Sequence, residues 1–272
     1  MKSILLPVDQ SETMPAVLET ARLLADMFGA TVEGVALRPA FADIVAPDPI
    51  VAVTIPPADW NEADFTRSVR QAFDAFAAGY YPSAPDSARF RWRGGPPIDD
   101  AALGSLGRVH DITVLGRPGG RGARMTAIES ALFDSGRPVL MAPPDTPETI
   151  GETVLIHWNA STETARCMRF AMPILRKARR VSLIAVEGAI VPGPSIKDAV
   201  GYLEANGVAA TEKSVVPRSG RPGEAILAEA KAQGADLLIK GAYTQSRLRQ
   251  MIFGGATSHI LGAAELPVFF AH

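Results

Sequence analysis

One pattern of apolar and polar runs occurs twice in this chain, and this repeat limits the possible folds more than any other feature. The apolar run 4–8 ends in a short polar cluster that contains Ser11, and a matching run with its own cluster recurs 150 positions later at residues 154–161. A second run, Asp111–Gly116, recurs 125 positions later as Asp236–Gly241. Internal similarity of this kind indicates two copies of one folding unit.

Strand-like and helix-like patterns alternate within each copy. Apolar residues recur every three or four positions at 17–28 and at 165–175, which is typical of a helix that buries one face. The expected strands are Ile4–Val8, Thr31–Leu37, Ala88–Trp92, Asp111–Gly116 and Pro138–Met141 in the first copy, and Val154–Ile156, Val181–Val186, Ala210–Val216, Asp236–Gly241 and Pro267–Phe270 in the second. Further helices are expected at 59–78, 99–109 and 224–233, in the stretch that ends at 206, and from Thr257.

This alternation predicts an α/β fold. The strands are short and almost continuously apolar, as in parallel sheets that are covered by helices on both faces. Right-handed crossovers then give a doubly wound sheet in each copy. We therefore expect two tandem, doubly wound, Rossmann-like domains.

The boundary between the copies falls at a proline-rich segment. Residues 143–147 read Pro-Pro-Asp-Thr-Pro, which is typical of a stiff, exposed linker and divides the chain into domains 1–145 and 146–272. Each domain ends in a strand that would leave an exposed edge if the domain stood alone. We predict that Val139–Met141 pairs with Val268–Phe270, which makes the chain an internal pseudo-dimer. The sequence leaves open whether two chains associate further into a homodimer.

Composition excludes several functional classes. Hydrophobic residues make up 47% of the 272 residues and charged residues 21%, which is typical of a globular protein and not of a disordered one. The net charge of −2 argues against a nucleic-acid partner or a polybasic membrane binder. Cys167 is the single cysteine, and no apolar run reaches the length of a membrane span. We expect a soluble, cytoplasmic protein without a membrane partner.

The strongest functional signal follows the run 236–241. Doubly wound sheets bind ligands outside the carboxyl ends of their strands, and here a polar loop leads to Gly254, Gly255 and then Thr257 at the start of a helix. Glycines allow the backbone to approach a phosphate closely, and the N–H groups of a helix start favour an anion. The same pattern is also typical of a strand–loop–helix turn without a ligand.

With this segment the chain resembles the universal stress protein family in its tandem two-domain form, over nearly its whole length. The nucleotide motif of that family is Gly, two residues, Gly, nine residues, Gly, and then Ser or Thr. Gly241 and Gly254 match the first and third glycine with the spacing intact, whereas Thr244 replaces the second glycine and Gly255 replaces the Ser or Thr. A β-branched residue at position 244 costs about 1–2 kcal/mol if the position needs a positive φ.

The resemblance implies domains of the adenine-nucleotide-binding-like kind, a ligand and a set of contacts. Gly241, Thr244 and Gly254 would face the triphosphate of ATP or a related adenine nucleotide, with Mg²⁺ alongside it, and Thr257 matches a further Thr that is common in the family. The nucleoside would face the residue after the first strand of the domain, which is Asn159. The −5 charge of residues 1–145 against +3 for residues 146–272 also favours the second half for an anion.

The first half offers a weaker set of candidates. Gly116 and Gly119 keep the Gly-x-x-Gly pair, and the position of the final Ser or Thr falls at Ser130, next to Glu129. Asp9 stands where the second half has Asn159. Asp9 is also placed to cap the helix that starts near Thr13, and we expect the side chains of Ser11 and Ser161 to cap the first helix of each half.

The apolar segment Pro39–Trp60 has two interpretations. It either covers an edge of the sheet or the other half, or it forms a lid or pocket for a hydrophobic ligand. Outside this segment, the histidines are isolated, no metal-ligand spacing occurs, and Cys167 reads as a core residue.

The resemblance implies a stress-response protein. We expect it to be non-catalytic, because no P-loop, dinucleotide fingerprint or nucleophile elbow is present. No catalytic or metal-binding residue is assigned. The alternatives are a slow ATPase, for which Asp9 and Glu129 are the available carboxylates, and a binder of a hydrophobic ligand through Pro39–Trp60.

Overall fold

A computed structural model describes residues 1–39, 41, 43–47, 50–54, 56–80, 89–119, 125–217, 220–243 and 255–272. The elements of the first half are β1 (Ser3–Val8), α1 (Met14–Phe28), β2 (Thr31–Ala36), β3 (Asp43–Pro47), β4 (Ile50–Thr54), α2 (Glu62–Tyr80), β5 (Phe90–Trp92), α3 (Asp100–Gly107), β6 (Ile112–Gly116), α4 (Met125–Asp134) and β7 (Val139–Ala142). Those of the second half are β8 (Thr153–His157), α5 (Thr162–Leu175), β9 (Arg180–Val186), α6 (Ile196–Ala205), β10 (Thr211–Val215), α7 (Pro222–Ala232), β11 (Leu237–Gly241), α9 (Ala256–Ala263) and β12 (Val268–Ala271).

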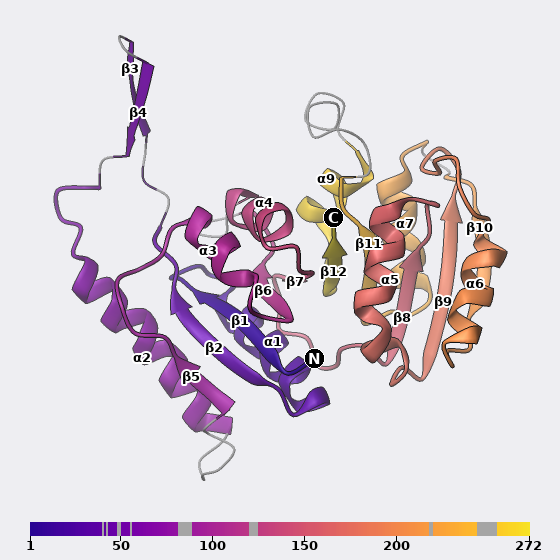
Figure 1. Cartoon of the computed structure of the whole chain (residues 1–272), viewed down its shortest axis with the longest axis horizontal. Helices are drawn as coiled ribbons and strands as arrows, with labels where there is room; N and C mark the ends of the chain where they lie inside the picture. Colours follow the sequence, from indigo (N-terminus) through magenta and orange to yellow (C-terminus); the bar gives the residue numbers. More distant parts are fainter. Residues whose placement is uncertain are drawn as a thin grey trace.

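The two halves share one sheet of ten strands, in the order β10-β9-β8-β11-β12-β7-β6-β1-β2-β5 (Figure 1). Each half contributes five parallel strands, and within each half the strand order reverses once, between β8 and β11 and between β1 and β6. The predicted α/β, doubly wound, mostly parallel architecture is confirmed. The division into domains 1–145 and 146–272 stays a prediction, because the sheet runs through both halves without a break.

The strand pairing that joins the halves is the one that the sequence predicts. β12 pairs with β7 antiparallel, with Val268 opposite Met141, Phe269 opposite Leu140 and Phe270 opposite Val139. All six side chains are fully buried. Because this is the antiparallel pair of the sheet, the carboxyl ends of the parallel strands of the two halves lie at opposite edges.

Helices cover both faces of the sheet in both halves (Figure 1). One continuous apolar core contains the buried faces of α1, α2, α5 and α6, and a second core contains those of α3, α4, α7 and α9. Successive strand residues enter alternate cores, as the two-residue period of a strand requires. Ile156 and Ile239 therefore lie in the first core, whereas Leu155 and Leu238 lie in the second.

The duplicated unit repeats a contact of its fold in detail. The carboxylate of Asp111, just before β6, accepts hydrogen bonds from the backbone N–H groups of Lys2 and Ser3 at the start of β1. The carboxylate of Asp236, just before β11, accepts from the N–H groups of Glu152 and Thr153 at the start of β8. One carboxylate in each half thus fixes the start of the central strand.

The two predicted helix caps have different outcomes. The hydroxyl of Ser161 accepts a hydrogen bond from the N–H of Thr164 at 3.2 Å, so the predicted cap of α5 is confirmed. The prediction for Ser11 is wrong, because the N-cap position of α1 is Thr13 and no side chain caps that helix. Asp9 instead accepts a hydrogen bond from the N–H of Ser11 at 2.8 Å, which holds Ser11 in a turn before the helix.

The segment between β2 and α2 contains a hairpin that the sequence pattern does not predict. β3 and β4 pair antiparallel with each other, and Figure 1 shows them beyond one end of α2, away from the ten-stranded sheet. The interpretation of Pro39–Trp60 as a cover for the sheet edge is therefore wrong for these two strands. The end of the segment does pack on the first half, because the Trp60 ring lies 5.0 Å from the ring of Phe65 on α2.

Candidate functional site

The reversal of strand order in the second half brings several predicted residues to one edge of the sheet. Asn159 follows β8, Gly241 ends β11, and Gly255 and Thr257 lie at the start of α9. The crevice at such a switch point is where doubly wound sheets bind ligands. Thr244 and Gly254, the remaining predicted residues of this half, lie outside the described residues.

Asn159 is buried and organises the start of α5. Its Oδ1 atom accepts hydrogen bonds from the N–H of Ser161 at 3.2 Å and from the hydroxyl of Thr164 at 2.5 Å. Its backbone carbonyl accepts from the N–H of Val191, which lies in the loop after β9. The described contacts of Asn159 are therefore internal to the fold.

Gly241 has a packing role that its place in the motif does not reveal. A Cβ atom at this position would lie 2.6 Å from the backbone nitrogen of Thr164 and 2.7 Å from its hydroxyl oxygen. The first turn of α5 thus approaches the end of β11 so closely that only glycine fits. This contact explains the residue without any ligand.

The start of α9 has free capacity for an anion. Gly255 occupies the N-cap position in an extended conformation (φ −94°, ψ 172°), and no side chain of the described residues caps the helix there. The first N–H groups of a helix have no partner within the helix, and the helix dipole makes this end positive. Thr257 lies in the first turn and is 3% exposed.

A buried lysine lies directly beneath this helix start. Lys240, on β11, donates hydrogen bonds from Nζ to the carbonyl of Gly241 and to the hydroxyl of Thr257, both at 2.8 Å. The side chain is 3% exposed, and burial lowers the pKa of Lys240 to about 8. Lys240 is not among the site residues predicted from the sequence, although a lysine inside the apolar run Leu237–Gly241 is a recognisable signal.

His157 is the strand neighbour of Lys240. The two residues are opposite each other on β8 and β11, and strand alternation places both side chains on the face of the sheet that α9 covers. His157 is 1% exposed, and neither ring nitrogen has a hydrogen-bond partner among the residues that the structure describes. Burial, together with the charge of Lys240, lowers the pKa of His157 to about 3, so the imidazole is neutral.

Cys167 approaches Lys240 from the other face of the sheet. Its thiol donates a hydrogen bond to the backbone carbonyl of Lys240, with 3.2 Å between the sulfur and the oxygen. Burial raises the pKa of Cys167 to about 12, so the group is a neutral thiol. The prediction that Cys167 is a core residue is confirmed.

The match to a known protein family falls in the second half of the chain. Residues 174–272 match the universal stress protein family. Over these residues the chain is similar to that family. The match includes β11, α9 and the loop between them. The residues of the candidate site on β8 and just after β8 lie outside the match.

Solved structures resemble the whole chain. A universal stress protein from Archaeoglobus fulgidus is 16% identical, with a TM-score of 0.71, and the alignment covers 99% of this chain and 95% of that one. A protein of unknown function from Pseudomonas aeruginosa is 13% identical, with a TM-score of 0.55 and a coverage of 100% and 92%. These likenesses show the fold, and the tandem form is consistent with them because both cover both halves.

A shorter match concerns a protein with a bound ligand. A universal stress protein solved in complex with cAMP is 16% identical, covers 44% of this chain and 97% of its own, and has a TM-score of 0.36. The cAMP is a property of that protein. The comparison with curated proteins gave no match.

The predicted residues of the first half lie at the opposite edge of the sheet from the candidate site of the second half. Asp9 follows β1 and bonds the N–H of Ser11, and Gly116 ends β6. Gly119 has φ 125°, a conformation that favours glycine. Ser130 lies in the middle of α4, where its hydroxyl donates to Asp134 and where a Cβ on Gly104 of α3 would be 2.5 Å from its oxygen.

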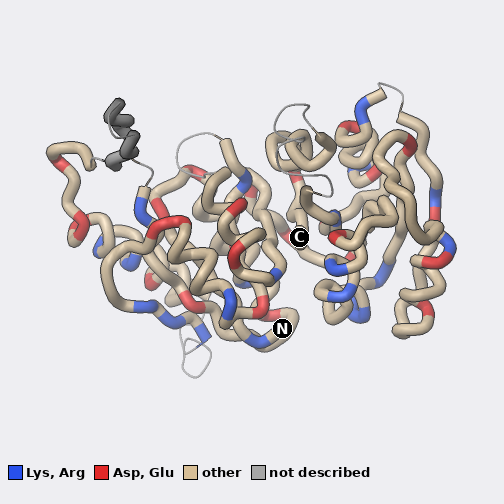
Figure 2. The backbone as a smooth tube through the Cα atoms, turned by 45° about the horizontal axis from the view of Figure 1, so that its top comes forward, with Lys and Arg blue, Asp and Glu red and all other residues tan. Residues whose placement is uncertain are grey.

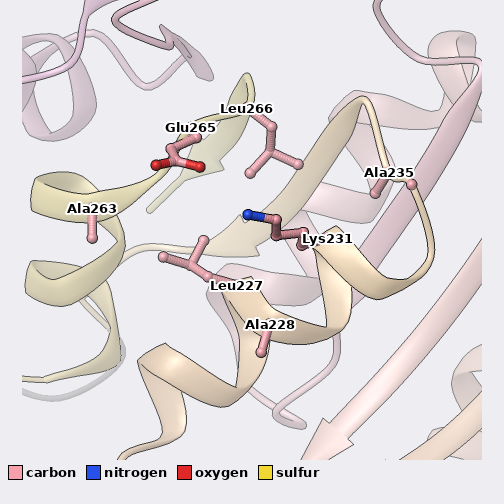
Figure 3. Close-up of a pocket in the computed structure, with 8 residues that line it drawn as sticks. Leu227, Ala228, Lys231, Ala235, Ala263, Glu265 and Leu266 are labelled. Atoms are coloured by element: carbon pink, nitrogen blue, oxygen red, sulfur yellow. The ribbon is translucent and has the colours of Figure 1, made fainter.

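Two described cavities lie near the elements of the site. A cavity of about 450 Å³ lies between α7 and the end of α9, and Figure 3 shows Lys231 and Glu265 among its lining residues. It is also lined by Ala235 and Leu266, which precede β11 and β12, so it lies toward the amino ends of these strands and away from the switch point. An apolar slot of about 400 Å³ lies between α5 and α6, with Trp158 and Tyr202 in its wall.

Charge and metal-ligand patterns add little to the site. Figure 2 shows acidic and basic residues interspersed along the described backbone of both halves. Within the described residues, no three His, Cys, Asp or Glu side chains are grouped as metal ligands would be. None of the described helices is both long and apolar enough to cross a membrane.

Proposed function

We propose that this chain is a non-catalytic, cytoplasmic stress-response protein whose second half binds ATP or a related adenine nucleotide at the edge formed by β8, β11 and α9. The observation that carries the proposal is the uncapped start of α9 beside the switch point. N–H groups at a helix start bind phosphate well, since both their direction and the helix dipole favour an anion.

Two further features support the second half over the first. Gly255 is the N-cap of α9 and Thr257 lies in its first turn, whereas Ser130 lies in the middle of α4 and packs on α3. The second half carries a net charge of +3, against −5 for the first. The first half then serves as the partner that completes the sheet through β7 and β12.

The test introduces a competitor for the phosphate without disturbing the fold. Gly255→Asp places a favourable N-cap carboxylate over the N–H groups that would bind phosphate, and the extended backbone of Gly255 accepts a side chain. We expect calorimetric titration of nucleotide-free protein with ATP to give at least a tenfold loss of affinity for this variant.

Gly255→Asn is the matched control. Its side chain has the same size and caps a helix equally well, but it carries no charge that repels a phosphate. Relative to the wild type, we expect the loss of ATP-binding free energy in Gly255→Asn to be less than half of the loss in Gly255→Asp. Equal affinity of wild type and Gly255→Asp for ATP, or no ATP binding by the wild type, contradicts the proposal.

The ATPase alternative needs a carboxylate beside the phosphates. Of the two carboxylates that the sequence offers, Asp9 lies at the opposite edge of the sheet. The other, Glu129 on α4, accepts a hydrogen bond from the hydroxyl of Tyr243 at 3.5 Å. A turnover assay on the calorimetry samples tests this alternative. An ATPase would release phosphate faster than the Gly255→Asp variant does, whereas a protein that only binds ATP would not.

The apolar slot favours a second candidate function, the binding of a small hydrophobic ligand. The slot lies between α5 and α6 and not in Pro39–Trp60, where the sequence placed this alternative. Mass spectrometry of molecules extracted from the purified chain separates the two functions. A nucleotide supports the first proposal, and an apolar molecule without nucleotide supports the second.

A further inference from the structure

Lys240 is a buried cation without an anionic partner among the residues that the structure describes. Its two hydrogen-bond acceptors, the carbonyl of Gly241 and the hydroxyl of Thr257, are both neutral. The nearby Cys167 is a neutral thiol, and none of the described ion pairs involves Lys240. A buried charge is costly unless it is paired, so this position needs an explanation.

The surroundings of Lys240 increase this cost. The ammonium lies beneath the first turn of α9, and the positive end of a helix disfavours a cation. The chain segment between β11 and α9 supplies no counter-charge either, because residues 244–254 contain two arginines and no aspartate or glutamate. Each of these features favours an anion from outside the chain.

His157 is a second, independent sign of a missing partner. Within the described part of the chain, both ring nitrogens of this buried side chain lack a hydrogen bond, although nearly all buried polar groups in proteins have one. His157 and Lys240 are neighbours in the strand register and share one face of the sheet. A neutral imidazole has one N–H to donate, so this side chain can also serve an anion.

The first half provides an internal comparison. The repeat aligns Lys240 with Leu115 and His157 with Pro7, so the first half has apolar residues at both positions. The fold therefore needs neither the lysine nor the histidine at the ends of its central strands. The polar pair is specific to the half that has the uncapped helix start.

We infer that Lys240, His157 and Thr257 form a binding site for one phosphate group. Lys240 has a third N–H that its two described acceptors do not use, and Thr257, which accepts from Lys240, can donate its own hydroxyl hydrogen to a phosphate oxygen. His157 donates one ring N–H. Charge-assisted hydrogen bonds of this kind are strong where water is excluded.

This inference deepens the proposed function and rests on it for the nucleotide as the source of the phosphate. It assigns the phosphate contact to residues outside the glycine motif, two of whose positions are altered in this chain. The phosphate comes either from a nucleotide or from a free phosphate compound. The experiment below separates these sources.

The test compares three probes in calorimetric titrations of the full chain: ATP, tripolyphosphate and adenosine. Lys240→Met keeps the length and apolar stem of the side chain and removes the charge. We expect this variant to lose at least tenfold in affinity for tripolyphosphate and for ATP, with the affinity for adenosine unchanged. Lys231→Met, which removes an exposed lysine from α7, is the matched control and should bind all three probes as the wild type does.

A second substitution keeps the test decisive if Lys240→Met does not fold. Thr257→Val preserves the shape of the side chain and removes only the hydroxyl. We expect Thr257→Val to weaken tripolyphosphate binding severalfold and to leave adenosine binding unchanged. Circular dichroism and the thermal unfolding midpoint establish which variants are folded.

The outcomes separate the two claims. Wild-type protein that binds adenosine but not tripolyphosphate, or a folded Lys240→Met that binds tripolyphosphate like the wild type, overturns the phosphate site and leaves the proposed function intact. Binding of tripolyphosphate that depends on Lys240, without any advantage for ATP and without adenosine binding, supports the site and overturns the adenine nucleotide. Failure to bind any of the three probes overturns both.

Discussion

Two polar residues, Lys240 and His157, distinguish the strand ends of the second half from the matching strand ends of the first half. Both occupy strand ends where the sister half has apolar residues, and both are almost completely buried. The sequence shows each as a polar residue in an apolar run. It does not show that they face the same side of the sheet, because that depends on the register of β8 and β11.

The buried lysine predicts a pH dependence of stability. The pKa of Lys240 falls from 10.5 to about 8 in the folded chain because of burial. Between these values the unfolded chain binds more protons, so the free energy of unfolding rises with pH in this window and is lowest below it. His157 on β8 and Cys167 on α5, the titratable groups near Lys240, have pKa values of about 3 and about 12 and do not titrate there.

Urea unfolding at pH 7.5, 8.5 and 9.5 measures this dependence. The wild type should gain stability relative to Lys240→Met as the pH rises, because only the wild type has the ammonium to lose. The comparison cancels the other lysines and tyrosines, which both proteins share. Parallel pH profiles of the two proteins would show that Lys240 is not a buried cation.

At the scale of single elements, most of the fold follows from the sequence. The apolar runs predict the strands of the ten-stranded sheet, and the helices expected from the sequence match α1, α2, α3, α5, α6, α7 and α9 to within a few residues. The sequence places no helix at α4 (Met125–Asp134). The cap of α5 follows from Ser161, whereas α1 starts later than Ser11 predicts, since Pro15 lies in its first turn, where proline is well tolerated. The β3–β4 hairpin falls in a region that the sequence analysis treated as loop.

The close contact between α5 and β11 predicts the effect of one substitution. Gly241→Ala forces a Cβ to within 2.6 Å of the backbone nitrogen of Thr164, and this backbone atom cannot move aside without moving the helix. We expect a loss of about 1–3 kcal/mol in the free energy of unfolding, measured by urea denaturation.

Gly262→Ala is the control for this substitution. Gly262 lies in α9, and a Cβ there would meet nothing within 4 Å. Alanine is favoured over glycine inside a helix, so this variant should be as stable as the wild type or more so. If Gly241→Ala were as stable as the wild type, the packing role of Gly241 would be contradicted. Ligand binding would then be the remaining explanation for a glycine at this position.

At the scale of the whole molecule, duplication produces one sheet with two unlike edges. The antiparallel pairing of β7 with β12 follows from the exposed edge that each half would otherwise have, so the sequence predicts it. The candidate site follows from the sequence only in part. The motif leads to Gly255 and Thr257, but the internal contacts of Asn159 and Gly241 depend on how closely α5 approaches, which no sequence spacing reveals.

A crystal structure of the chain grown with ATP tests the central claim most directly. We expect nucleotide density at the edge formed by β8, β11 and α9, with a phosphate oxygen within hydrogen-bond distance of Lys240 Nζ and of the hydroxyl of Thr257. Nucleotide density at the opposite edge, beside Gly116 and Gly119, would contradict the account, and so would phosphates at the predicted edge that do not contact Lys240.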